Sequence, residues 1–324
     1  MKILLVQIKR IGDLILTTPA IRCLREAFPR ARLILLTDAS CRGLLSAVDV
    51  DECLVHDKRG GNTWLRRLPA LRPDWCLDFS GTDRAMFFSA LSRAKRRVNF
   101  LRFQKKFLRR FVFTDFVDSS VRNRHTADHY TDLLRPLGIT RENVPLNLRL
   151  PEKAMTETLL ASRGVSHPYA VIHAGTAREE KYWVPERWAA TADHLRETRG
   201  LLPVFTGGTA PDERAHIGAI RSAMTGRSVD LSGATDLAGL AGVIAGARVF
   251  CGVDTAAMHL ADAVRTPTVA LFGPTNPYHW RPRHTPSVVL RADTMGPFDV
   301  RQKGGPMEHL SEAQVRSALE TLLG

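Results

Sequence analysis

The stretch MKILLVQIKRIGDLILTTP, residues 1–19, decides the fold of this chain. Its apolar start, Lys2–Ile8, is typical of a strand that is buried on both faces of a parallel sheet. Gly12 and Asp13 follow at once. A carboxylate just after the first strand stands where open α/β sheets bind their ligands. Asp13 is therefore predicted to be either a general base or a cap of the helix that follows.

Pro19 bears on the choice between these two roles. Proline is tolerated in the first turn of a helix and not in its interior, so we expect the main helix to run over Thr18–Ala27. Asp13 is then free or at the head of a kinked first turn. This favours the general base, with the helix cap as the alternative.

Short apolar strands alternate with helical patterns along the rest of the chain. Strands are predicted at Ala31–Leu36, Glu52–Val55, Trp75–Phe79, Arg97–Asn99, Tyr169–His173, Leu202–Thr206, Ser228–Leu231, Val249–Val253, Pro267–Phe272 and Ser287–Leu290. Helices are predicted at Thr82–Ser92, Pro185–Arg196, Pro211–Ala223, Asp236–Ala245, Thr255–Val264 and Ser311–Leu323. This alternation predicts an α/β fold with parallel sheets covered on both faces, and right-handed crossovers put the carboxyl ends of the strands on one side.

The segment 140–166 has two prolines and no clear period, and it is predicted to be a linker. We therefore expect two Rossmann-like, doubly wound domains, over residues 1–150 and 151–324. Ligands bind at the carboxyl ends of the strands in each, so the two domains are expected to face a central cleft.

Composition narrows the classes of function. No apolar run is long enough to span a membrane and no signal peptide is evident, so a cytoplasmic protein is expected. The five cysteines are scattered, which disfavours a zinc site and a disulfide framework. The net charge of +13 suggests a polyanionic partner.

Much of that charge lies in the segment Arg93–Arg110, where phenylalanines alternate with basic residues. This segment is either a solvated loop flank or a basic, partly apolar surface for an anionic, lipid-linked acceptor. Nucleic acid is disfavoured because no nucleic-acid-binding motif accompanies the charge. The residues predicted to contact the acceptor are Gly12, Arg93, Arg96, Lys105 and Lys106.

The usual phosphate loops GxxxxGK[ST] and GxGxxG are absent, as is the nucleophile elbow GxSxG. The segment HAGTAREEKYW, residues 173–183, follows a predicted strand instead. Its Gly175 and Thr176 offer hydrogen-bond donors and Lys181 offers a mobile charge, which suits a phosphate. A polar surface loop is the alternative.

The segment TGGTAPDE, residues 206–213, follows the next strand. Gly207 permits close approach of a ligand to the backbone, and Glu213 is placed to accept hydrogen bonds from ribose hydroxyls. A plain strand-to-helix turn, with Glu213 favouring the helix dipole, is equally consistent with the pattern.

The segment GVDTAAMHLADA, residues 252–263, follows a third strand. Asp254 or Thr255 is expected to cap a helix whose amino terminus attracts an anion, and Ala256 leaves room for it. His259 falls in the first turn or so of that helix. It is a candidate donor contact, although a single histidine at such a place is more often structural.

In FGPTNP, residues 272–277, Phe272 is a candidate to flank an aromatic base, although the segment taken alone favours an ordinary loop after a buried strand. Together these segments predict a nucleotide-diphosphate site in the second domain. Asp13 would then deprotonate an acceptor hydroxyl that attacks a sugar, while Lys181 and the helix near Asp254 hold the leaving diphosphate. This arrangement needs no metal ion and no cofactor.

Several stretches together resemble the ADP-heptose–lipopolysaccharide heptosyltransferases, family 9 of the glycosyltransferases. The resemblance extends from residue 1 to about residue 285 and is carried by KRIGDLILTTPAIRCLREAFP, HAGTAREEKYW, TGGTAPDE, LSGATDLAGLAGVIAGARVFCGVDTAAMHLADAV and PTVALFGPTNP.

The resemblance implies a GT-B fold and inverting, metal-independent transfer of heptose from an ADP-activated donor to the lipid A–core oligosaccharide, at the anionic inner face of the membrane. It implies that Asp13 is the base. It implies further that the donor contacts Thr176, Lys181, Glu213, Asp254, Thr255 and His259. The family often has glycine where this chain has Ala256, and HWRPRHTP is most similar to the branch that adds a side heptose.

Two other classes of function are weighed against this one. The first is another GT-B enzyme, either a transferase of a different nucleotide sugar or an epimerase, which would need further carboxylates. The second is a non-enzymatic polyanion-binding protein, which accounts for the charge but leaves the motifs at the strand ends unexplained.

Overall fold

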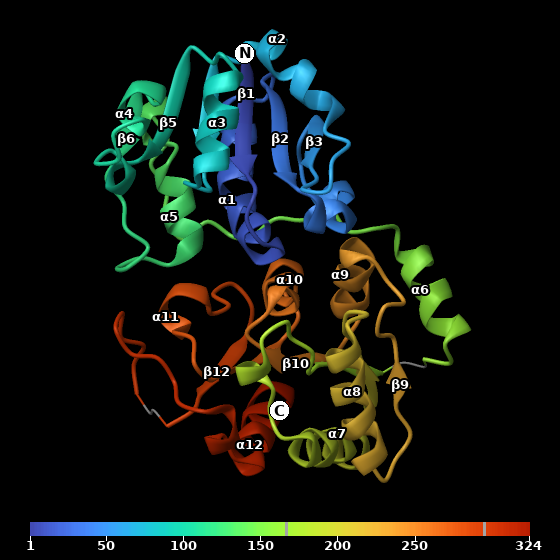
Figure 1. Cartoon of the computed structure of the whole chain (residues 1–324). Coiled ribbons are helices and arrows are strands. Elements are labelled where there is room, and N and C mark those ends of the chain that lie inside the picture. Colours follow the sequence, from blue (N-terminus) through green and yellow to red (C-terminus); the bar gives the residue numbers. More distant parts are fainter. Residues whose placement is uncertain (166–167, 294–295) are drawn as a thin grey trace. The chain divides into compact units, whose positions relative to one another are not determined.

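The computed structural model describes residues 1–165, 168–293 and 296–324, and the chain divides into the units Met1–Arg149 and Leu150–Gly324. Within these residues each unit contains one six-stranded sheet with every strand pair parallel, and helices cover both faces of each sheet (Figure 1). This arrangement confirms the predicted fold class. The division falls next to the predicted boundary between residues 150 and 151.

The sheet of the first unit has the strand order β3-β2-β1-β4-β5-β6. Its strands are β1 (Lys2–Gln7), β2 (Arg32–Asp38), β3 (Glu52–His56), β4 (Trp75–Asp78), β5 (Arg96–Phe100) and β6 (Asp115–Val117). Its α-helices are α1 (Ile11–Ala27), α2 (Leu68–Leu71), α3 (Asp83–Leu91), α4 (Arg109–Val112) and α5 (Thr126–Asp132). Short 3-10 helices are η1 (Ala39–Ala47), η2 (Thr63–Arg66), η3 (Leu101–Phe103) and η4 (Arg135–Leu137).

The sheet of the second unit has the order β12-β11-β10-β7-β8-β9. Its strands are β7 (Tyr169–His173), β8 (Leu202–Phe205), β9 (Val229–Asp230), β10 (Val249–Val253), β11 (Thr268–Phe272) and β12 (Ser287–Arg291). Its helices are α6 (Lys153–Ser162), α7 (Pro185–Arg199), α8 (Pro211–Ala223), α9 (Leu237–Ala245), α10 (Ala256–Val264), α11 (Pro277–Trp280) and α12 (Glu312–Leu323), with η5 (Glu179–Lys181) and η6 (Met307–His309).

The apolar run of β1 shows why this segment forms a central strand. Ile3, Leu4, Leu5 and Val6 are all fully buried, so both faces of the strand are covered. Leu4 and Val6 belong to the same cluster as Phe88 of α3. Burial of such side chains contributes about 1.5–3 kcal/mol each, and it requires helices on both sides of the sheet.

Each sheet has one point at which the strand order reverses. In the first unit the chain passes from β1 outward to β3 and then returns to β4, on the other side of β1. In the second unit it passes from β7 to β9 and returns to β10. A crevice outside the carboxyl ends of the strands opens at such a switch point, and ligands of open α/β sheets bind there.

The first helix begins earlier than the sequence predicts. It runs from Ile11 through Pro19 without a break, so the predicted start at Thr18 is wrong. Pro19 has no N–H to donate to the carbonyl of Ile15, but the Thr18 hydroxyl donates to that carbonyl at 2.7 Å. The same hydroxyl accepts the backbone N–H of Asn147 at 3.1 Å. The bond to Ile15 satisfies the carbonyl that the proline leaves open, so the helix continues.

Two further elements depart from the predictions. The predicted linker 140–166 contains the helix α6, with only one fully buried residue, Leu160, which explains its weak apolar pattern. The last linker residue, Ser166, lies outside the described residues. Strand β6 was not predicted, because three residues carry too little pattern.

No helix in the described part of the chain is both long and apolar enough to cross a membrane. The five cysteines are all free, and all but Cys53 are buried.

Candidate active site

Asp13 lies at the switch point of the first unit, in the first turn of α1. The Tyr130 hydroxyl donates a hydrogen bond to Oδ1 of Asp13, and the Lys9 ammonium lies 4.0 Å from the same oxygen. The N-cap position is Arg10, and no side chain of the described residues caps the helix there. Asp13 is therefore inside the helix rather than its cap, and its carboxylate is 14% exposed.

Lys9 and Tyr130 set the electrostatics around Asp13. Burial lowers the pKa of Lys9, which the Asp13 carboxylate opposes and Arg102 reinforces. Burial and the Asp13 carboxylate raise the pKa of Tyr130 well above its usual value, so its hydroxyl stays protonated and donates. Sequence reasoning missed both residues. Lys9 had a signal, as a cation directly after the first strand, whereas nothing in the sequence marks Tyr130.

A second carboxylate lies across the switch point, at the end of β4. Asp78 is fully buried and accepts hydrogen bonds from the backbone of Ser80 and Gly81 and from the Asn99 amide, each at 2.9 Å. Burial raises its pKa to about 6, although the backbone bonds from Gly81 and Ser80 oppose the rise. Its oxygens are occupied by the loop after β4 and by Asn99 of β5, so Asp78 supports the site rather than facing a ligand.

The structure divides the predicted acceptor-binding residues into two groups. Arg93 and Arg96 stand before and at the start of β5, at the amino edge of the sheet, about 15 Å of strand from its carboxyl end. Arg96 is also paired with Asp115 and stacked on Trp75. The fold thus does not bring these two residues near Asp13.

Gly12, Lys105 and Lys106 lie on the carboxyl side of the sheet, Gly12 in the first turn of α1 and the lysines after η3. Phe107, Leu108 and Phe111 follow the lysines and are 62–66% exposed. We call these three residues the apolar tip. The Arg110 guanidinium stacks on Phe107 and Phe111, at 4.5 and 4.9 Å from their centroids. The tip therefore presents apolar rings beside positive charge.

In the second unit, Lys181 and Asp254 form a buried ion pair across the β7–β10 switch point. The Lys181 ammonium donates to Oδ2 of Asp254 at 2.7 Å and to its backbone oxygen at 2.8 Å. Both residues are less than 10% exposed. An ammonium has three hydrogens, so one donor of Lys181 remains for an anion at the same place.

Glu213 explains the glycines of the two preceding loops. A Cβ at Gly175 would lie 1.8 Å from Oε1 of Glu213, one at Gly207 would lie 3.1 Å from it, and one at Gly208 2.6 Å from Oε2. The Glu213 carboxylate therefore rests directly against both backbones. This brings together Gly175, Gly207 and Glu213, as expected if they line one site.

Helix α10 begins beside the Lys181–Asp254 pair. Thr255 is its N-cap and Ala256 its first residue, but neither Asp254 nor Thr255 makes the predicted capping bond. The Thr255 hydroxyl oxygen is buried and has no hydrogen-bond partner within the described ranges. The first N–H groups of the helix are thus not capped by these side chains, which suits an anion. His259 is 5% exposed in the next turn.

The structure favours the ordinary-loop interpretation at Phe272. This residue ends β11, and its side chain is fully buried. It is not available to flank a base. Thr176 is buried, and its hydroxyl accepts the Arg178 N–H at 3.3 Å.

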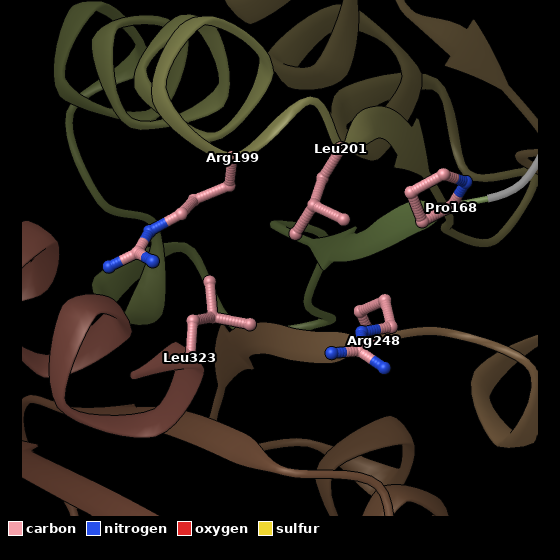
Figure 2. A pocket seen from close by; sticks show the side chains of 5 residues that line it. All are labelled: Pro168, Arg199, Leu201, Arg248 and Leu323. Atoms are coloured by element: carbon pink, nitrogen blue, oxygen red, sulfur yellow. The ribbon is translucent and has the colours of Figure 1, made fainter.

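Two cavities of the second unit lie at opposite edges of its sheet. One of about 370 Å³ is lined by Pro168, Arg199, Leu201, Arg248 and Leu323 (Figure 2). Three of these residues directly precede strands, so this cavity lies at the amino edge, away from Lys181. Another, of about 420 Å³, is lined on the carboxyl side by residues that include Glu179, Tyr182 and Pro274.

Among the described residues, no His, Cys, Asp and Glu side chains gather in a group that could hold a metal ion.

Comparisons with known proteins show the family of the chain. The family model described as glycosyltransferase family 9 (heptosyltransferase) matches residues 89–310. Lipopolysaccharide heptosyltransferase 3 of Escherichia coli K12 is 28% identical over 286 residues, which cover 84% of this chain and 82% of that protein.

Two solved structures resemble the whole chain. A glycosyl transferase family 9 protein from Veillonella parvula superposes with a TM-score of 0.85 at 26% identity, covering 99% of this chain and 97% of that one. The ADP-heptose lipopolysaccharide heptosyltransferase II of E. coli superposes with a TM-score of 0.83 at 20% identity, covering 100% and 98%.

Proposed function

Because the chain belongs to glycosyltransferase family 9, we propose that it transfers heptose from ADP-heptose to the inner core of lipopolysaccharide. The proposed reaction is inverting, needs no metal ion and adds a side-branch heptose. The observation that carries the proposal is the Lys181 ammonium beside the amino end of α10, at the switch point of the second unit. A cation beside a helix amino terminus that the Thr255 side chain does not cap suits a diphosphate.

The donor half of the reaction uses the second unit. We assign the diphosphate to Gly175, Thr176, Lys181 and the first N–H groups of α10, and the ribose to Glu213. As the bond between the anomeric carbon and the phosphate oxygen breaks, ADP leaves with the electron pair. The Lys181 ammonium and the helix amino terminus stabilise the charge that grows on the phosphate.

The acceptor half uses Asp13. Its Oδ1 is occupied by Tyr130, while Oδ2 accepts no hydrogen bond from the part of the chain that the structure describes. In the proposal Oδ2 takes the proton of the acceptor hydroxyl as the hydroxyl oxygen bonds to the anomeric carbon. A single displacement of this kind inverts the configuration of that carbon.

The acceptor is anionic and lipid-linked in this proposal. Lys105 and Lys106 would meet its phosphate and carboxylate groups, and the apolar tip would touch the inner face of the membrane. Exposed phenylalanines beside basic residues are the composition of surfaces that lie at anionic lipid interfaces. Arg93 and Arg96 are left out of the acceptor site, because they lie at the other edge of the sheet.

An ADP-release assay tests the proposal. ADP-heptose and other nucleotide sugars are offered with a panel of truncated lipopolysaccharide cores, with and without EDTA. We expect release only with ADP-heptose, unaffected by EDTA, and inversion at the anomeric carbon by NMR. Asp13→Asn should lower turnover about 10²–10⁴-fold with ADP affinity retained. Glu186→Gln, in the first turn of α7, is the control. Preference for another nucleotide sugar, or full turnover by Asp13→Asn, would overturn the assignment.

A further inference from the structure

We propose that Tyr130 is the positioning residue of Asp13: its hydroxyl holds one carboxylate oxygen, so that the other oxygen is presented to the acceptor hydroxyl. The inference rests on the proposed function, in which Asp13 is the base. It adds a role for a residue that lies far from Asp13 in the sequence and in none of the motifs.

The hydrogen-bond geometry carries the inference. The Tyr130 hydroxyl donates to Oδ1 of Asp13, and the Lys9 ammonium lies 3.5 Å from the Tyr130 oxygen and 4.0 Å from Oδ1. Both partners thus act on the same oxygen. When one oxygen of a carboxylate is fixed, the lone pairs of the other oxygen point in a defined direction. Proton abstraction requires such a defined direction toward the hydroxyl.

Packing makes Tyr130 a rigid donor. The residue is 2% exposed, and its ring meets Phe79 edge-on with centroids 5.9 Å apart. It is carried by α5, whose residues are nearly all buried. At the other end of the bond, the Thr17 hydroxyl donates to the Asp13 backbone oxygen at 2.7 Å. Neither residue therefore needs to be ordered when a substrate binds.

The charges around the pair must be considered for any pH effect. Lys9 and Arg102 are cations nearby, Arg122 and Arg124 act on their neighbours, and Asp78 on β4 and the Cys41 thiol on η1 also lie in this region. Burial lowers the pKa of His129, the neighbour of Tyr130, to about 3, so this side chain is neutral in the working range.

A hydrogen bond to a carboxylate favours its charged form, so loss of the donor makes protonation easier. We expect Tyr130→Phe to move the acid limb of the kcat/KM profile upward by about one pH unit, and to lower kcat about tenfold at neutral pH. ADP affinity should not change. An acid limb that belonged to Asp78 would stay in place, since the bonds to that carboxylate are intact in the variant.

The experiment compares the pH profiles of the wild-type chain, Tyr130→Phe and Tyr169→Phe, using ADP-heptose and the acceptor that the release assay selects. Tyr169 is a matched control: it is fully buried and its hydroxyl donates to the Val243 carbonyl at 2.6 Å, at the amino edge of the other sheet. The folded fraction of each variant is measured by circular dichroism at every pH, and the rates are divided by it, so the position of the limb remains informative if either variant is less stable.

The outcomes separate this inference from the proposed function. An acid limb that moves in Tyr130→Phe and not in Tyr169→Phe supports the positioning role. An unmoved limb in Tyr130→Phe, together with an inactive Asp13→Asn, overturns the role of Tyr130 and leaves Asp13 as the base. An active Asp13→Asn overturns both.

Discussion

Gly175→Ala tests the donor site through a single methyl group. The added Cβ would lie 1.8 Å from Oε1 and 2.5 Å from Cδ of Glu213, closer than the 3.0 Å that real Cβ atoms keep. The backbone at Gly175 has no positive φ, so alanine itself is accepted there. The Glu213 carboxylate must therefore withdraw from the two glycine loops before the methyl fits.

The expected magnitude follows from what is lost. Glu213 is a half-buried side chain that is free to turn outward, so the free energy of unfolding should change by less than about 1 kcal/mol. A hydrogen bond to a charged group contributes about 1.5–3 kcal/mol. If Glu213 binds the ribose as proposed, removing its carboxylate should thus weaken ADP binding by about 10- to 100-fold.

Calorimetric titration of ADP into Gly175→Ala, Glu213→Ala and the double variant gives the test. We expect each single variant to lose the same factor and the double variant to lose no more, because both changes remove one interaction. The control is Gly218→Ala in α8, whose added Cβ meets no atom of the described chain within 4 Å. It should leave ADP affinity alone and stabilise the fold by about 0.5–1 kcal/mol.

Additive losses of ADP affinity in the double variant would contradict a shared role of Gly175 and Glu213. If Gly175→Ala still weakens ADP binding about tenfold in the Glu213→Ala background, the methyl group acts on the ligand directly and the Glu213 carboxylate has no part in the effect. Unchanged ADP affinity in Gly175→Ala alone would remove both residues from the donor site.

Three further predictions concern other parts of the chain. Lys181→Met should weaken ADP binding by about 30- to 100-fold in calorimetry, and equal affinity would exclude Lys181 from the site. Burial lowers the pKa of His173 to about 4, so only the unfolded chain takes up this proton between about pH 6.5 and 4. The free energy of unfolding should therefore fall by up to about 3 kcal/mol as the pH drops through that window, and urea titrations of His173→Gln should show a flatter fall. Replacing Phe107 and Phe111 by serine should reduce sedimentation with anionic vesicles several-fold, whereas Met155→Ser, at an equally exposed residue, should not; the same loss in both would contradict a specific tip.

Local patterns in the sequence were sufficient to predict most strands, and also the helices that begin at a clear local signal. The strands β7 and β10 and the helix α8 have the bounds that the sequence predicts, because buried runs and Pro at a helix start are local signals. Pro19 misled the prediction of α1, since the Thr18 hydroxyl replaces the missing donor to Ile15 and only the folded chain shows it.

Some residues of the candidate site could likewise be placed from the sequence, and others could not. The sequence alone placed Asp13, Lys181 and Asp254 after strands, and parallel connections bring such ends to one edge of a sheet. It gave no way to separate Arg96 from Lys105, because both lie in one basic segment while β5 carries them to opposite edges.

Most strands and helices, and the order in which they alternate, were thus determined by the sequence itself, since each depends on side chains a few residues apart. Only the tertiary structure decided which side chains meet: Tyr130 at Asp13, the ammonium of Lys181 at Asp254, and Glu213 against Gly175. Such contacts depend on the strand order and on the packing of distant helices, and no local period records them. For this reason the carboxylate after the first strand was visible in the sequence, whereas the hydroxyl that orients it was not.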